Sequence, residues 1–293
     1  MEKQRKTLLP LTSDFVFKAV YGQDTQESNA ALRALLNCLL DKKDNPIEWV
    51  QCANPFIPSK HITGKESILD IKVRLSSGQL VDLEMQVTNL AHYINRSIFY
   101  MGKLITSSLD KGQNYGKMKP TIVISIVNGT LFPNRPSAHS RYTLHEKIVK
   151  EELSDLTQIH FLELNKIDLA KPVNEMTTYE RIGAYFKYAN DESKQDLIGE
   201  LIQYETEVLS LTNPILHEVS HDDYMRDLEE AHEKYLHDLA TALEAADEAR
   251  IEGENRISQL HEKLFNENRM DDLKRSFSDK DFRNQLLIEY GLK

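Results

Sequence analysis

The chain has 293 residues, 40% of them apolar, enough for one large domain or for a domain with an extension. No apolar run approaches the length of a membrane span, and two cysteines do not make a disulfide framework. The composition therefore argues against a membrane protein and favours a reducing, cytoplasmic setting. The formal net charge is -10, and residues 217–272 alone hold 17 acidic and six basic side chains. The preceding 216 residues hold 26 acidic and 25 basic side chains, so the acidity belongs to the C-terminal part.

The first predicted elements are two helices and a strand. Ser13 or Asp14 can cap a helix whose apolar face begins at Phe15, and leucines at helical spacing predict a second helix over residues 29–40. A strand is predicted over residues 47–57, where prolines end it. Considered by itself, Asp14 is a helix cap.

Residues 67–88 have the pattern of two strands joined by a tight turn around Gly78, because apolar and polar side chains alternate on both sides of it. Side chains two apart on a strand share a face, so one face of this hairpin is apolar and is expected in the core. The other face carries five polar residues: Asp70, Lys72, Asp82, Glu84 and Gln86.

The carboxylates of Asp70 and Glu84 are expected to meet near the middle of the two strands. Two anions at that distance repel unless a proton or a metal lies between them, and Mg²⁺ prefers carboxylate and carbonyl oxygens. A metal held there can activate water and stabilise a phosphate group during its transfer. The alternative that the alternation leaves open is an ordinary solvated face of a hairpin.

A helix is predicted over residues 91–111. Apolar residues at helical spacing predict one buried face, made of Ile94, Ile98, Met101 and Ile105. A second face carries Arg96, Tyr100 and Lys103. On that face Arg96 could hold a phosphate group that Tyr100 orients, and the alternative is plain contact with solvent.

The apolar run of residues 121–127 predicts a strand that is covered on both faces. Strands mixed with helices indicate an α/β domain, and the helix between the Glu84 strand and this run suits a crossover connection. The remaining predicted elements of this region are strands at residues 141–149 (an edge strand) and 159–164, and helices at residues 178–190 and 192–209.

A domain boundary is predicted at residues 212–214, which divides the chain into a domain of residues 1–213 and an acidic helical extension of residues 214–293. A short helical cap is predicted at its end, over residues 270–293. A heptad seam is a coiled-coil signal, and it predicts a homodimer through this helix, with folding back onto the first domain as the alternative. The seam consists of Leu236, Leu239, Leu243, Ala246, Ile257, Leu260 and Leu264, with Arg250 and Gly253 at its two weak positions.

Asp70, followed after 13 residues by Glu84-Met85-Gln86, resembles the signature of the PD-(D/E)XK nuclease superfamily in its E-x-Q form. The surroundings are similar, in order and spacing, to the recombination-promoting nucleases, often labelled transposase-like. The similar stretches are residues 12–18, 65–73, 81–86, 96–100 and 119–124. The resemblance implies a restriction-endonuclease-like mixed sheet flanked by helices.

The resemblance also implies a divalent metal, Mg²⁺ or else Mn²⁺ or Ca²⁺, held by Asp70 and Glu84 with the backbone carbonyl of Met85 as the third ligand. It places Asp14 and Lys18 at the edge of the site, among the groups that meet DNA.

Gln86 departs from the wider superfamily, which has a lysine at this position. An amide can orient a water molecule by hydrogen bonding, but it cannot supply positive charge. Lys72 lies two residues from Asp70 on the same face, and it is the candidate that replaces this charge.

These features together predict a metal-dependent DNA endonuclease that acts in recombination, mobile-element biology or defence. One alternative is a catalytically weak or inactive nuclease fold that serves as an interaction protein through its coiled-coil extension. Another is a metal-dependent hydrolase of a different phosphoester. A nearly neutral first domain predicts weak, salt-sensitive, non-specific DNA binding.

Overall fold

The computed structural model describes residues 7–54, 56, 70–86, 90 and 92–292. By its internal contacts the chain divides into two units, Met1–Glu230 and Ala231–Lys293. The first unit contains a β-sheet with helices around it, and the second is helical.

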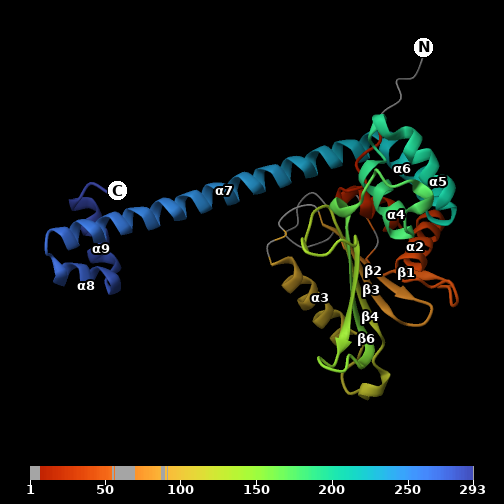
Figure 1. Ribbon diagram of the computed structural model, residues 1–293, viewed down its shortest axis with the longest axis horizontal. Helices are drawn as coiled ribbons and strands as arrows, with labels where there is room; N and C mark the ends of the chain where they lie inside the picture. Colours follow the sequence, from red (N-terminus) through yellow and green to blue (C-terminus); the bar gives the residue numbers. More distant parts are fainter. Residues whose placement is uncertain (1–6, 55, 57–69, 87–89, 91, 293) are drawn as a thin grey trace, which may run out of the picture. The chain divides into compact units, whose positions relative to one another are not determined.

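Within the described residues, a six-stranded mixed sheet forms the centre of the first unit (Figure 1). The strands follow the order β1-β2-β3-β4-β6-β5. Neighbours pair in parallel along β3, β4 and β6, whereas β1–β2, β2–β3 and β5–β6 are antiparallel. The predicted mixed α/β fold is therefore confirmed, with β5 as the predicted edge strand. The strands are β1 Val50–Cys52, β2 Ile71–Leu75, β3 Leu80–Gln86, β4 Thr121–Val127, β5 His139–His145 and β6 Glu152–Glu163.

The predicted hairpin consists of β2 and β3, and their pairing places Lys72 opposite Asp82. Gly78 closes the turn with a φ of 81°, a left-handed conformation that glycine adopts without steric cost. The apolar face of the hairpin is fully buried, as expected, and it contributes Ile71, Val73, Val81, Leu83 and Met85 to the main core. The outer ends of the predicted hairpin, residues 67–69 and 87–88, lie outside the described residues.

The main core is shared with this apolar face by α1 Asp14–Tyr21, α2 Gln26–Leu39, α4 Thr178–Tyr188, α5 Gln195–Tyr204 and α6 Thr206–His221, and Met225 and Leu228 further along the chain join it. Ser13 is the N-cap of α1, since its hydroxyl accepts a hydrogen bond from the Val16 N–H, and Asp14 is the first helical residue. In Figure 1 these helices gather apart from α3, which lies beside the sheet.

Helix α3 (Tyr93–Ser107) joins the parallel strands β3 and β4 and forms the predicted crossover. Its predicted buried face is wrong at Ile94 and Ile98, which are 39% and 56% exposed, and confirmed at Met101. Tyr93 and Ser97 are buried instead of the two isoleucines. The physical reason is the surface that α3 covers. The helix packs against β4 and β6, where the Tyr93 ring joins a small core with Val127 and Phe161 while the Tyr93 hydroxyl donates to Glu84 on β3.

The long helix begins later than predicted. Pro214 lies inside α6, and α7 (Asp223–Asn266) starts after a break at Asp222. Proline removes one hydrogen bond from a helix interior. The helix continues because Leu209, Thr212 and Leu216 on both sides of Pro214 are fully buried in the core.

The second unit consists of the rest of α7 together with α8 (Met270–Ser278) and α9 (Lys280–Glu289). The predicted terminal cap is thus two helices, and it covers only part of the heptad seam. Leu260 and Leu264 pack with Leu286 of α9 in a small core, whereas Leu239 and Leu243 are 44% and 56% exposed. Among the described residues, no helix has both the length and the apolar character that crossing a membrane requires.

Candidate functional site

The polar face of β2 and β3 brings several predicted residues together beneath α3. Asp70 immediately precedes β2, Lys72 lies within β2, and Glu84 and Gln86 lie within β3. Asp70 and Gln86 are each 9% exposed, and the Glu84 side chain is 15% exposed. This burial distinguishes the cluster from an ordinary solvated face, where carboxylates remain in water.

Asp70 is held through its backbone. Its carbonyl oxygen accepts hydrogen bonds from Lys18 Nζ and from Asn54 Nδ2, both at 2.9 Å. Asn54 Oδ1 also accepts from the Lys72 backbone N–H at 2.8 Å, which ties the start of β2 to the same point. The Asp70 carboxylate forms an ion pair with Lys72 Nζ at 3.3 Å. The carboxylate is therefore presented from a fixed backbone beside a half-exposed lysine.

Lys18, on α1, is 1% exposed and supports Asp70 from the interior rather than facing solvent. Burial lowers the pKa of this ammonium, and the nearby Asp70 carboxylate opposes that effect. Gly22 leaves space for its side chain, because a Cβ there would lie 2.9 Å from Lys18 Cγ. Asp14, at the start of the same helix, is close enough to Glu84 to raise the pKa of that carboxyl group.

Glu84 is covered from α3. The Tyr93 hydroxyl donates to Glu84 Oε2 at 3.0 Å, and Arg96 Nη2 donates to Glu84 Oε1 at 2.5 Å. The same Arg96 nitrogen also contacts Gln86 Oε1, and the guanidinium lies 4.5 Å from the centre of the Tyr93 ring. In this conformation Arg96 supplies the positive charge that balances Glu84.

The pKa values of the ionisable groups in this cluster are shifted because the groups are partly removed from water. Burial raises the pKa of Glu84, and Arg96 and the Tyr93 hydrogen bond offset part of that rise. Partial burial lowers the pKa of Lys72, but the Asp70 carboxylate outweighs it, so the net shift is upward and the ammonium stays charged. Tyr100 is also close enough to Lys72 to raise that pKa.

Asp82 is a member of the site that the sequence analysis left without a role. It lies on β3 opposite Lys72 and is 5% exposed. Burial, followed by repulsion from the neighbouring Asp70 carboxylate and a hydrogen bond between the two groups, raises the pKa of Asp82 to about 7. Asp82 and Asp70 are thus a close pair of carboxyl groups on one face of the sheet.

Comparison with known proteins identifies the family. A sequence profile of the PD-(D/E)XK nuclease family transposases matches residues 11–246. The chain belongs to this family. The match covers the sheet, the helices around it and the first half of α7, and it gives this PD-(D/E)XK protein a nuclease-like or transposase-like role. No curated protein and no solved structure shows significant similarity to the chain.

PD-(D/E)XK nucleases usually use divalent metals, and the question is whether the oxygen atoms of this site suit such a cation. In the part of the chain that the structure describes, no group of three or more His, Cys, Asp or Glu side chains forms a metal cluster. Mg²⁺ needs fewer, since it keeps several waters and binds through one or two carboxylates. Asp70 and Glu84 supply two, and Asp82 Oδ1 is buried without a hydrogen-bond partner among the described residues. These oxygens fit a hard cation.

Met85 can contribute to such a site only through its backbone, because its side chain lies in the main core.

Tyr93, like Asp82, belongs to the site although the sequence analysis assigned it no role there. Its only signal was its position three residues before Arg96, which places both residues on one side of a helix. For Asp82 the signal was present, since the alternation places it on the same face as Glu84.

Proposed function

We propose that this protein is a metal-dependent DNA endonuclease that hydrolyses phosphodiester bonds. The observation that carries the proposal is that the buried Asp70 and the partly buried Glu84 share one face of the sheet, beside the charged Lys72. Removing carboxylates from water is costly, and carboxyl groups crowded together with perturbed pKa values mark a candidate functional site.

The residues have separate roles in this proposal. Asp70, Glu84 and the Met85 carbonyl hold the metal, which is Mg²⁺ or else Mn²⁺ or Ca²⁺. When bound, the metal polarises the scissile phosphate and lowers the pKa of a water molecule. Gln86 orients the attacking water through its amide. Lys72 stays protonated beside Asp70 and stabilises the negative charge that develops on the phosphate.

DNA is the proposed substrate, and its backbone passes over the outer edge of the site. Arg96 and Tyr100 are partly exposed on α3, and in this proposal they hold and orient a phosphate group. Asp14 and Lys18 form the inner edge, where Lys18 acts by holding Asp70. The nearly balanced charge of the first 216 residues makes non-specific binding weak and salt-sensitive. Recombination, mobile elements or defence in the cytoplasm is the proposed setting.

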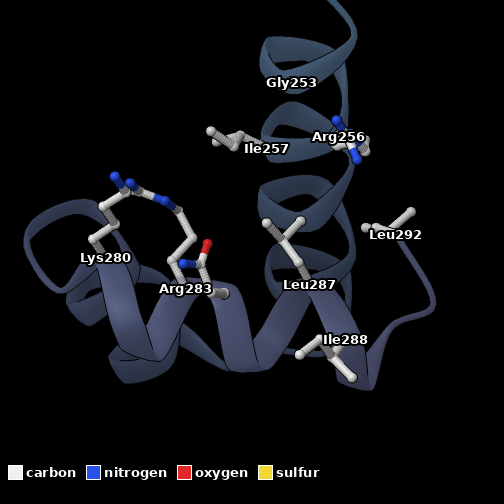
Figure 2. Close-up of a pocket in the computed structure, with 9 residues that line it drawn as sticks. Gly253, Arg256, Ile257, Lys280, Arg283, Leu287, Ile288 and Leu292 are labelled. Atoms are coloured by element: carbon white, nitrogen blue, oxygen red, sulfur yellow. The ribbon is translucent and has the colours of Figure 1, made fainter. Parts of the chain in front are cut away.

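We also propose that the protein is a homodimer through its C-terminal helix. The heptad positions Leu239 and Leu243 of α7 are exposed. Further along the same heptad seam, at Gly253 and Ile257, a cavity of about 550 Å³ lies between α7 and α9 (Figure 2). Leu287 and Ile288 add to its apolar lining, and its rim carries Arg256, Lys280 and Arg283. An apolar side chain from the acidic α7 of a second copy fits this cavity in both polarity and charge.

The dimer is tested by light scattering during gel filtration, with the double variant Leu239→Glu and Leu243→Glu. We expect the wild type to be dimeric and the variant monomeric, with unchanged near-ultraviolet circular dichroism. A wild type that is monomeric at micromolar concentration contradicts the dimer. The exposed seam also favours the second candidate function, an interaction protein with a weak or inactive nuclease site.

Nicking of supercoiled plasmid by the full-length protein decides between the two functions. The reactions contain Mg²⁺, Mn²⁺ or Ca²⁺, and the variants Asp70→Ala and Glu84→Ala serve as controls. We expect the wild type to nick with at least one metal and both variants to be inactive. Absence of nicking with every metal refutes the endonuclease and leaves the interaction protein. Hydrolysis of a small phosphodiester without nicking indicates a different phosphoester as the substrate.

A further inference from the structure

Arg96 occupies the oxygens that a metal at this site needs. One nitrogen, Nη2, donates both to Glu84 Oε1 and to Gln86 Oε1, while Tyr93 donates to Glu84 Oε2. Both carboxylate oxygens of Glu84 are therefore engaged by donors from α3. A divalent cation on Glu84 would lie next to the guanidinium, and two cations at such a distance repel strongly in a partly buried site.

The attachment of Arg96 is weak for a guanidinium, which offers five N–H donors. Its Nε is buried and has no hydrogen-bond partner among the described residues, and its side chain is 37% exposed. Arg181 shows what a fixed arginine looks like in the same protein. Its Nε, Nη1 and Nη2 are all used, on Glu205, on two backbone carbonyls and on Thr178, and its side chain is 15% exposed.

We propose that Arg96 is a resident counter-ion that a divalent metal must displace from Glu84 and Gln86 before it can bind. The inference rests on the proposed endonuclease function and adds a regulatory step to it. Rotation of the Arg96 side chain toward solvent frees Glu84 Oε1 and Gln86 Oε1 together, because a single nitrogen holds both. The released guanidinium lies on the exposed side of α3, where it can hold a phosphate group.

The exchange couples the two ligands of the enzyme. A DNA phosphate that binds Arg96 removes it from Glu84 and so strengthens metal binding, and by linkage the metal strengthens DNA binding by the same factor. The metal site is therefore weak in the free protein and strong on DNA. Removal of Arg96 should strengthen metal binding and weaken cleavage at once. A purely structural role for Arg96 predicts that both decline together.

The experiment measures Mn²⁺ binding to the full-length protein without DNA, from the electron paramagnetic resonance signal of free Mn²⁺. Arg96→Gln is compared with the wild type, with Arg96→Lys, and with Lys103→Ala as a control that removes a charge elsewhere on α3. We expect Arg96→Gln to bind Mn²⁺ at least about 10-fold more tightly than the wild type, equivalent to about 1.4 kcal/mol. Arg96→Lys should lie between the two, and Lys103→Ala should match the wild type.

A second readout keeps the test informative if Arg96→Gln folds poorly. Mn²⁺ should raise the melting temperature of Arg96→Gln more than that of the wild type, measured against samples in chelator. Mn²⁺ affinity in Arg96→Gln that is equal to or below the wild-type value overturns the counter-ion role and leaves the endonuclease proposal standing. Absence of Mn²⁺ binding in every variant, including Arg96→Gln, overturns both.

Discussion

Two glutamates of the sheet, the partly buried Glu84 on β3 and the fully buried Glu163 at the end of β6, are held in different ways. Glu163 is fully buried, and its Oε1 accepts from the Leu131 and Phe132 N–H groups at 2.6 and 3.0 Å. Its Oε2 forms an ion pair with Lys166 Nζ at 2.6 Å. Glu84 has one hydroxyl and one nitrogen of a partly exposed arginine.

This difference distinguishes a structural part of the sheet, around β5 and β6, from the part around β2 and β3 that holds the candidate site. Around β5 and β6 the polar groups are tied to fixed partners, as with Glu163 and with His139 and His160, whose ring nitrogens lie 3.1 Å apart. Around β2 and β3, carboxyl groups crowd together and Asp82 keeps an oxygen without a hydrogen-bond partner among the described residues. A saturated charge holds a fold together, while an incompletely satisfied one can accept a ligand.

The largest effect is expected for Glu84→Gln, which keeps the shape but removes the charge. Nicking should fall by at least about 1,000-fold, since several kcal/mol of metal-derived stabilisation is lost. The free energy of unfolding should change by no more than about 1 kcal/mol, because the partner Arg96 is 37% exposed and can turn toward solvent. Plasmid nicking measures the loss of activity, and urea denaturation measures the free energy of unfolding. Strong destabilisation by this substitution would show that Glu84 is a structural residue like Glu163.

Glu163→Ala should show the reverse pattern. It leaves Lys166 buried without its partner, so the free energy of unfolding should fall by about 3–5 kcal/mol. Nicking per folded molecule should stay within about twofold of the wild-type rate, which corresponds to less than about 0.5 kcal/mol. Denaturation curves and initial rates at low temperature give both numbers. A selective loss of nicking in a stable variant contradicts a structural role.

Lys72→Ala tests whether the charge beside Asp70 takes part in the reaction. The ion pair is half exposed and adds little to stability, so the melting temperature should hardly change. Nicking should fall by about 100-fold, in the range for loss of one positioned charge or proton donor. Arg74→Ala, an exposed residue two positions along the same strand, is the matched control. Equal rates in Lys72→Ala and the wild type refute the role of Lys72.

The last expected effect is an acid dependence of stability that arises from His139 and His160, on β5 and β6. The pKa of His139 is lowered to about 4 and that of His160 to about 3. Burial is the main cause in both, and the positive charge of Arg141 lowers both pKa values as well. In the unfolded chain both titrate near pH 6.5, so below that pH the unfolded state binds protons that the folded state does not. Stability is complete above about pH 6.5 and falls by up to about 1.4 kcal/mol per pH unit for each histidine as the pH drops toward 4.

Urea midpoints between pH 7 and 5 measure this dependence. His160→Gln should reduce the slope, whereas His145→Gln, at an exposed position on β5, should leave it unchanged. An identical slope in the wild type and His160→Gln would show that other groups cause the acid loss.

Much of the fold could be predicted from local patterns. Strict alternation on both sides of Gly78 specified the hairpin, and the apolar run of β4 with a helix before it specified the parallel crossover. The buried face of α3 could not be predicted in the same way. Counting apolar residues favours Ile94 and Ile98, but the helix turns Tyr93 and Ser97 inward instead, and only the tertiary fold shows that.

The site was predictable as a set of residues and not as a set of contacts. Alternation placed Asp70, Asp82 and Glu84 on one face, because that follows from strand geometry alone. The contact of Arg96 with Glu84 depends on how α3 lies over the sheet, and the support of Asp70 by Lys18 links residues 52 positions apart. Such long-range contacts leave no local periodicity to detect.

The two hydrogen bonds on the Asp70 carbonyl bear on the entropy of ligand binding. Fixing one residue's backbone costs about 1–2 kcal/mol of conformational entropy, and here folding has already ordered it through Lys18 and Asn54. A ligand that binds the Asp70 carboxylate then needs to order only side-chain torsions. A buried lysine that never touches the ligand is in this way a determinant of how tightly the site holds one.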